Sequence, residues 1–110
     1  MTTIPALETV IGRLMDKDQA SVFALLDIAT ERLRQITAEG WTPEHDDRHA
    51  NHELSRAAGC YALHQKGNET PLLWPWDAAW WKPRSQYWNN VRAGALLVAE
   101  LARHTRSAPL

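Results

Sequence analysis

Apolar residues recur at helical spacing in four segments of the chain, and no segment shows the clear alternation that indicates a half-buried strand. The segments lie at 4–15, 20–38, about 50–62 and about 84–105. With 110 residues, the chain can bury about two-thirds of its unfolded surface, which is enough for one modest core. We therefore predict a single all-α domain over residues 1–110, a compact bundle of three or four helices with a frayed tail at 106–110.

The segment at 20–38 has the strongest helical pattern. Asp16 to Gln19 has the form of a capping box, and Gly40 is placed to end the helix. The opposite face of this helix is charged and is expected to be solvated; it contains Asp27, Glu31, Arg32, Arg34 and Glu39. The apolar stripe is expected to face the core; it contains Val22, Phe23, Leu25, Leu26, Ala29, Leu33 and Ile36.

The third segment is rich in small residues on one face. Leu54, Ala57, Ala58 and Tyr61 share this face, so a neighbouring helix could approach it closely. The same face would also suit a homodimer, and the sequence leaves the oligomeric state open. On the last segment, the predicted core face contains Tyr87, Val91, Ala95, Val98 and Ala102.

Positive and negative charges nearly balance, with 12 Lys and Arg against 13 Asp and Glu. This balance excludes the broad basic surface with which duplex DNA binders neutralise phosphates. The single cysteine, Cys60, excludes an internal disulfide framework and a zinc module built on several cysteines. No apolar run reaches the roughly 18–20 residues that span a bilayer, and the N-terminus lacks the basic start of a signal peptide. We expect a soluble cytoplasmic protein without a membrane partner.

A turn dense in acids and histidines separates the second and third segments. Residues 40–49 read GWTPEHDDRH, where Thr42 followed by Pro43 can cap a short helical turn. Helix is expected to resume near Ala50. The potential ligands and acid or base groups of this region are Glu44, His45, Asp46, Asp47, His49, His52 and Glu53.

The conformation of this turn decides its chemistry. If the turn is helical, His45, His49 and Glu53 fall at i, i+4 and i+8, where they could share a divalent metal. If it is a loop, Asp46 or Asp47 would cap the following helix. Capping with surface hydrogen bonding, recognition of a polar ligand, and metal binding therefore remain as three alternatives.

Six tryptophans stand against one phenylalanine, and five of the six lie between residues 74 and 88. Residues 68–83 read NETPLLWPWDAAWWKP, and this run of prolines and indoles predicts an ordered loop, because exposed indoles would favour aggregation. As structure, the loop would be a lid that buries aromatic surface over the bundle. As a binding element, a wall of indoles stiffened by proline could stack a planar ring. We expect most of these tryptophans to be core and one or two to reach a pocket or a partner subunit.

Basic residues follow this loop directly. Lys82 and Arg84 come at its end, and Arg92 lies two turns further on, on the last helix. Stacking rings beside cations match a nucleotide, which presents a base face and a phosphate charge. The structural alternative is that these cations are solvated or pair with Asp77 and Glu69.

Four blocks of the sequence occur in a distinctive order: ERLRQITAEGWTPEHDDRH, ELSRAAGCYAL, WPWDAAWWKP and NNVRAGALLVAELAR. Through these blocks, which cover about residues 30–103, the chain resembles a family of small uncharacterised proteins of bacteriophages and prophages. The resemblance implies a phage accessory protein in the cytoplasm of a bacterial host, and it supplies no catalytic residue. Residues 1–28 lie outside the blocks and form a variable helical segment.

These features predict a non-enzymatic binder of a nucleotide-like ligand, in a phage setting a protein that sequesters a host nucleotide signal. The ligand-binding candidates are Trp41, His45, Asp46, His49, Trp74, Trp76, Trp80, Trp81, Lys82, Arg84 and Arg92. One alternative is an all-α, metal-dependent nucleotide hydrolase, and its weak candidate ligands are Glu31, Asp46, His49 and Glu53. Another is an interaction module whose Trp loop blocks a host protein. A cofactor, a divalent metal, is expected only for the hydrolase.

Overall fold

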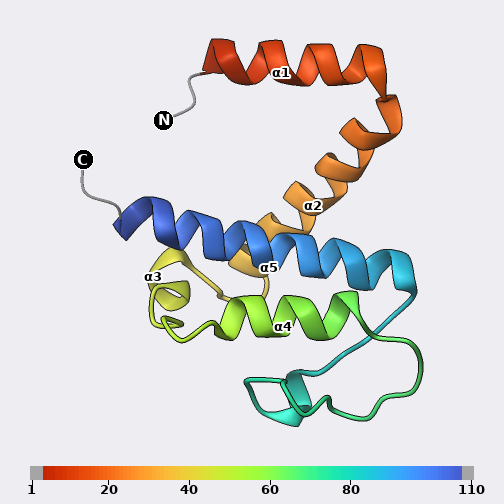
Figure 1. The fold of residues 1–110 in the computed structure, drawn as a ribbon. Helices are drawn as coiled ribbons and strands as arrows, with labels where there is room; N and C mark the ends of the chain where they lie inside the picture. Colours follow the sequence, from red (N-terminus) through yellow and green to blue (C-terminus); the bar gives the residue numbers. More distant parts are fainter. Residues whose placement is uncertain (1–3, 108–110) are drawn as a thin grey trace.

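The computed structural model describes residues 4–107, and this part of the chain consists of helices and loops without a strand (Figure 1). The predicted all-α class is therefore confirmed. In chain order the elements are α1 (Ile4–Lys17), α2 (Gln19–Thr37), α3 (Pro43–Asp46), α4 (Glu53–Ala62), a single 3-10 turn η1 (Ala78–Trp80), and α5 (Gln86–Ser107).

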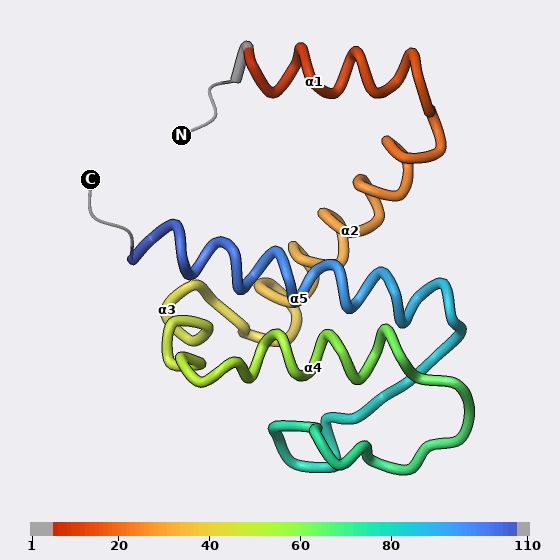
Figure 2. The backbone as a smooth tube through the Cα atoms, viewed as in Figure 1, coloured from red at the N-terminus to blue at the C-terminus, as the bar shows by residue number. Residues whose placement is uncertain are grey.

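The core lies between α4 and α5, which run side by side (Figures 1 and 2). The small-residue face of α4 makes this close approach, because Ala57 and Ala58 are buried against the face of α5 that contains Ala93 and Ala99. The predicted close approach of a neighbouring helix is confirmed. This face is consequently covered within the chain and is not free for a second copy.

The orientation of α2 differs from the prediction. Its charged face packs toward α5, and Glu31, Arg32 and Gln35 are buried, whereas the apolar side chains of Phe23, Leu25, Leu26 and Leu33 are exposed. The contact with α5 is close, because a Cβ on Gly94 would lie 2.8 Å from Ile28 Cδ1. The buried charges are tolerated because they pair with one another and with the acidic turn, as described below.

Helices α1 and α2 form an arm that joins the body at the C-terminal part of α2 and extends from it at α1 and the N-terminal part of α2 (Figure 2). Its bend is at Asp18, one residue after α1 ends, so the predicted capping box at Asp16 is wrong. Asp18 takes the N-cap position of α2, but its carboxylate accepts a hydrogen bond from the Ser21 hydroxyl rather than from a backbone N–H. The bend therefore has no side-chain cap on the backbone.

The other helix ends also differ slightly from the predictions. Helix α4 begins at Glu53 rather than near Ala50, and α5 extends to Ser107. Arg106, expected in a frayed tail, is helical and is held by Asp47, with Nη2 2.7 Å from Asp47 Oδ1. The remaining part of the predicted tail, 108–110, lies outside the described residues.

On α5, Val91 and Ala95 are buried as predicted, but Tyr87 and Val98 are exposed. Within residues 4–107, no helix is both long enough and apolar enough to cross a bilayer.

Candidate functional site

The acidic turn begins where α2 ends. Gly40 takes a positive φ of 75°, and the chain reverses so that the backbone N–H of Trp41 donates to Gln35 O at 3.0 Å. Thr42 then caps α3, because its hydroxyl accepts from the His45 backbone N–H, and Pro43 occupies the first turn. The predicted Thr-Pro cap is confirmed. It fixes the direction in which Trp41 and His45 leave the turn.

The two aspartates of the turn do not cap α4. Asp46 is 2% exposed, and its Oδ2 lies 2.7 Å from Arg32 Nη2. Asp47 binds Arg106 instead, and that hydrogen bond and positive charge hold the pKa of Asp47 below its ordinary value. The N-cap of α4 is His52, in a left-handed conformation with φ 65° and no side-chain cap. The predicted aspartate cap is therefore wrong, since both carboxylates have guanidinium partners that are distant in sequence.

Two of the clustered tryptophans are part of the core. Trp74 and Trp81 are buried and pack against Tyr61, with ring centroids 5.5 and 4.8 Å away. Trp74 Nε1 donates to Asp77 O at 3.1 Å, and the Tyr61 hydroxyl accepts from the Lys82 backbone N–H at 3.3 Å. These contacts hold the two ends of the loop against α4, as the expected lid does.

The end of the loop is fixed by Asn89, a residue that sequence reasoning missed. Its side chain is fully buried in the first turn of α5. The Asn89 Oδ1 accepts from Arg84 N at 2.7 Å, and its Nδ2 donates to Arg84 O at 3.0 Å. A polar residue in a helix that starts just after a proline-rich loop is the signal that could have indicated this anchor.

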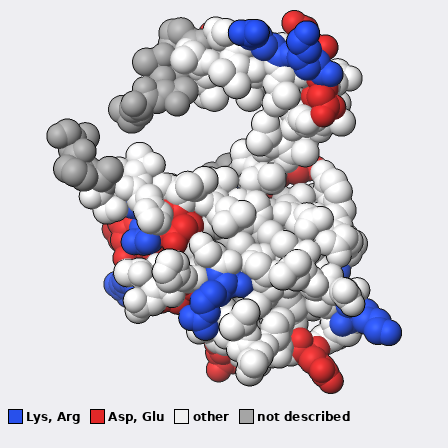
Figure 3. All heavy atoms as spheres, viewed as in Figure 1, with Lys and Arg blue, Asp and Glu red and all other residues white. Residues whose placement is uncertain are grey.

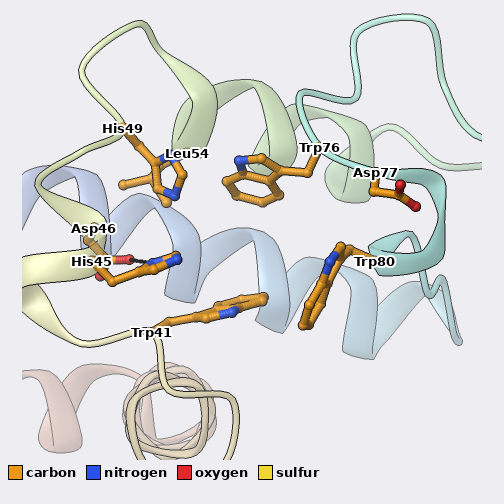
Figure 4. Close-up of a pocket in the computed structure, with 8 residues that line it drawn as sticks. All are labelled: Trp41, His45, Asp46, His49, Leu54, Trp76, Asp77 and Trp80. Carbon is orange, nitrogen blue, oxygen red and sulfur yellow. Dashed lines mark ion pairs between the residues drawn. The ribbon is translucent and has the colours of Figure 1, made fainter.

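An aromatic pocket of about 310 Å³ lies between the acidic turn and the Trp loop (Figure 4). In Figure 4, Trp41 and Trp76 lie on opposite sides of the space, Trp80 stands at one end, and the histidines close the other. The ring centroid of Trp41 lies 6.2 Å from that of Trp76 and 6.1 Å from that of Trp80, with tilted planes. The lining residues are Trp41, His45, Asp46, His49, Leu54, Trp76, Asp77 and Trp80.

The polar atoms of the aromatic pocket come from both of its ends. The His49 ring contacts both Trp76 and His45, with centroids 5.1 and 5.2 Å away. His45 Nδ1 is buried and lies 3.9 Å from Asp46 Oδ1, too far for a hydrogen bond (dashed line in Figure 4). Because no Lys or Arg is among the lining residues, the pocket suits an uncharged ring with polar edges better than a phosphate.

A second, basic pocket of about 260 Å³ shares its wall with the first. Trp41, Trp76 and Trp80 line both pockets, and the basic pocket also contains Lys82 and Arg92. Lys82 Nζ lies over the Trp80 ring, 5.7 Å from its centroid. Arg92 lies over Tyr61 and donates to the Lys82 carbonyl. The two cations are therefore held beside the indoles by ring contacts, and neither takes part in an ion pair among the described residues.

Glu31 and Arg34 line the basic pocket as a pair. Arg34 Nε lies 2.7 Å from Glu31 Oε1, and Arg34 Nη1 lies 2.9 Å from Glu39 Oε1. Burial acts to raise the pKa of Glu31, but the hydrogen bond and charge of Arg34, the amide of Gln35 and the charge of Arg92 outweigh it and leave this pKa lowered. The expectation that Glu31 lies on a solvated face is wrong, because its partners make burial tolerable.

The remaining ligand-binding candidates are placed differently. Trp74 lines the basic pocket from the core side, whereas Trp81 and Arg84 line neither pocket. Arg84 lies over the Trp88 ring, 5.5 Å from its centroid. Of the 11 candidates, the structure brings together Trp41, His45, Asp46, His49, Trp76 and Trp80 around one pocket, and Trp74, Lys82 and Arg92 join this wall in the other.

Of the four weak metal candidates, two pair with arginines and the other two lie beside each other. Glu31 pairs with Arg34, Asp46 pairs with Arg32, and His49 Nδ1 lies 3.6 Å from Glu53 Oε2. Among residues 4–107, no three His, Cys, Asp or Glu side chains are grouped as ligands of one metal ion.

Comparison of the chain with protein-family models, with curated proteins and with solved structures finds no match. The case for a function therefore rests on the geometry of the two pockets and on the sequence blocks.

Proposed function

We propose that the protein is a phage accessory protein that binds a nucleotide-like ligand in the bacterial cytoplasm, with the base in the aromatic pocket and the phosphate in the basic pocket. The observation that carries this proposal is the shared wall. Trp41, Trp76 and Trp80 line both pockets. A base that stacks on these indoles in the aromatic pocket therefore lies next to the pocket that contains Lys82 and Arg92.

The chemistry of the aromatic pocket favours a base. Stacking of a base on an aromatic side chain contributes about 1–3 kcal/mol per base. The edges of a base carry N–H donors and ring nitrogen acceptors, and the carboxylate of Asp77 with the imidazoles of His45 and His49 supplies the complementary groups. A flat ring between Trp41 and Trp76 needs about 7 Å, twice the carbon–carbon contact distance, so we expect the loop to open by about 1 Å on binding.

The phosphate end is assigned to Lys82 and Arg92. Arg34 lines the same pocket, but Glu31 and Glu39 already occupy its donors. Lys82 is exposed, and it lies over the ring on which the base would stack. A compact ammonium group beside a stacked base is a common way to bind phosphate as a point charge.

Binding without turnover fits a protein that sequesters a host nucleotide signal, one role that a phage accessory protein could have. Titration of cyclic, linear and ADP-ribose nucleotides with the intrinsic tryptophan fluorescence as readout tests the proposal. We expect one ligand class to bind below 100 µM, roughly 5.5 kcal/mol. The matched pair of variants is Trp80→Ala, in the shared wall, and Trp88→Ala, outside both pockets; only the first should weaken binding. If no nucleotide bound, or if both variants bound equally well, the proposal would be wrong.

A further inference from the structure

The first two helices carry an apolar surface that no described residue of the chain covers. On α2, Phe23, Leu26 and Leu33 form a stripe on the side opposite to the buried Glu31, Arg32 and Gln35. Leu26 is 61% exposed. A helix normally buries such a stripe, because the transfer of large apolar side chains out of water stabilises the fold.

The exposed apolar surface continues on the neighbouring helices. On α1, Leu7 and Val10 are exposed at i and i+3, and on α5, Leu97 and Leu101 are exposed at i and i+4. Figure 3 shows the molecule hollowed between the arm and the body, and most of the atoms drawn around this hollow belong to uncharged residues, with acidic atoms where the arm meets the body. Lys, Arg, Asp and Glu gather instead at the outer bend of the arm and on the body beside α3.

The chain exposes more surface than a compact monomer of its mass, which is area enough for a stable dimer interface. The surface of the chain is 7830 Å², whereas a compact monomer of 12.5 kDa exposes roughly 6,200 Å². The radius of gyration is 15.1 Å, against about 13 Å for a compact domain of this length. The excess, on the order of 1,600 Å² per chain, exceeds the roughly 800 Å² that each partner contributes to a standard interface.

The arm itself indicates what covers this surface. Helix α1 has 14 residues, a length that is marginal in water without tertiary packing, and within the chain it packs mainly on α2. Within the described residues, α1 therefore has an apolar side that packs on no groove, and the hollow between the arm and α5 is filled by no helix. In a dimer with two-fold symmetry, the arm of each copy would pack into the hollow of the other, so that both apolar surfaces would be buried.

We propose that the protein is a homodimer in which the α1–α2 arm of each chain packs into the hollow between the arm and α5 of the other. The near-neutral net charge of −1 sets up little repulsion between two copies. The exposed stripe of α2 lies on the side opposite to Glu31 and Gln35, which line the basic pocket, so the proposed interface and the pockets use different faces of α2.

Sedimentation equilibrium of the full chain between about 1 and 100 µM tests the proposal. We expect twice the chain mass of 12.5 kDa. Leu26→Asp on α2 and Leu97→Asp on α5 place a charge in the interface, and each should weaken dimerisation by about a hundredfold or more. Both positions are exposed within one chain, so each variant should keep the helical content and tryptophan fluorescence of the parent.

The matched control is Leu72→Asp, because Leu72 is 99% exposed but belongs to the loop before η1. This variant should remain dimeric. A single chain mass for the parent at 100 µM would overturn the proposal, and so would a dimer that Leu26→Asp and Leu97→Asp leave intact. If an unrelated protein covered this surface instead, the parent would give the first of these results, a single chain mass at 100 µM.

Discussion

Arg32 and Asp46 form an ion pair in the interior of the protein, with Arg32 Nη2 2.7 Å from Asp46 Oδ2. The pair joins the middle of α2 to the acidic turn and thereby sets where Trp41 and His45 enter the aromatic pocket. Arg32 Nη1 has no hydrogen-bond partner in the described residues, so the two charges are stabilised mainly by each other. Breaking the pair would cost free energy, because removal of one partner leaves the other charge buried without a counter-charge.

Removal of one partner should therefore be far more damaging than removal of both. We expect Arg32→Ala to lower the free energy of unfolding by about 3–5 kcal/mol, because it leaves a buried carboxylate without its counter-charge. The double variant Arg32→Met with Asp46→Leu should cost less than this. Urea denaturation measures both, and Arg13→Ala, at an exposed position of α1, is the control, expected to stay within about 0.5 kcal/mol of the parent. Equal losses for Arg32→Ala and Arg13→Ala would contradict the buried pair.

Glu31 should make the stability depend on acid pH. Its pKa is lower in the folded state than the ordinary value of 4.5, so it stabilises the fold above that pH, and this contribution disappears as the pH falls through the folded pKa. We expect the Glu31→Gln variant to lose stability less steeply than the parent below about pH 4.5. Thermal unfolding between pH 3 and 7 measures this slope. Glu69→Gln, at an exposed loop position, should keep the slope of the parent.

The neighbouring tryptophans 80 and 81 should respond differently to truncation. Trp81 is buried against Tyr61, so Trp81→Ala should lower the free energy of unfolding by about 3–5 kcal/mol. Trp80 is 44% exposed in the wall of the pockets, and Trp80→Ala should cost less than half of that. Chemical denaturation followed by circular dichroism gives both values. A larger loss for Trp80→Ala would mean that the pocket wall is part of the core.

Asn89 should hold the Trp loop to α5. Asn89→Ala leaves the N–H and the carbonyl of Arg84 without their partner, and we expect a loss of about 1–3 kcal/mol with a change in tryptophan fluorescence. Asn90→Ala, at the exposed neighbouring position, is the control. Hydrogen exchange of the Arg84 amide reports the anchor directly, and unchanged protection in Asn89→Ala would contradict its role.

Helical periodicity was sufficient to predict the fold class and the extent of most helices, because an apolar pattern with a period near 3.6 has few alternatives. It failed on the orientation of α2. The pattern shows an apolar stripe with Phe23 and Leu26, and it cannot show that Glu31 and Arg32 are neutralised by partners elsewhere in the chain. In the proposed dimer the stripe would be buried after all, against a second copy that a single sequence does not reveal.

The candidate site was likewise predicted only in part, because sequence pattern shows which residues are close in the chain but not which of them face one another. Six candidates around Trp41 and Trp76 meet in one pocket, since aromatic rings and acids that two neighbouring loops present tend to converge. Local sequence could not separate Trp80 from Trp81, because the period of a proline-rich loop does not show which side of it is buried. Nor could it show that Arg84 would stack on Trp88 rather than face the pocket.

The most direct test of the binding site is calorimetric titration of one matched pair of ligands, a nucleotide and its nucleoside, into the parent and into Lys82→Ala. We expect the parent to bind the nucleotide with a Kd below 100 µM. In Lys82→Ala, the affinity for the nucleotide should fall about tenfold, while the affinity for the nucleoside should stay unchanged. The result that would contradict it is no nucleotide binding, or an equal loss for both ligands, since then the cation beside Trp80 would not bind a phosphate.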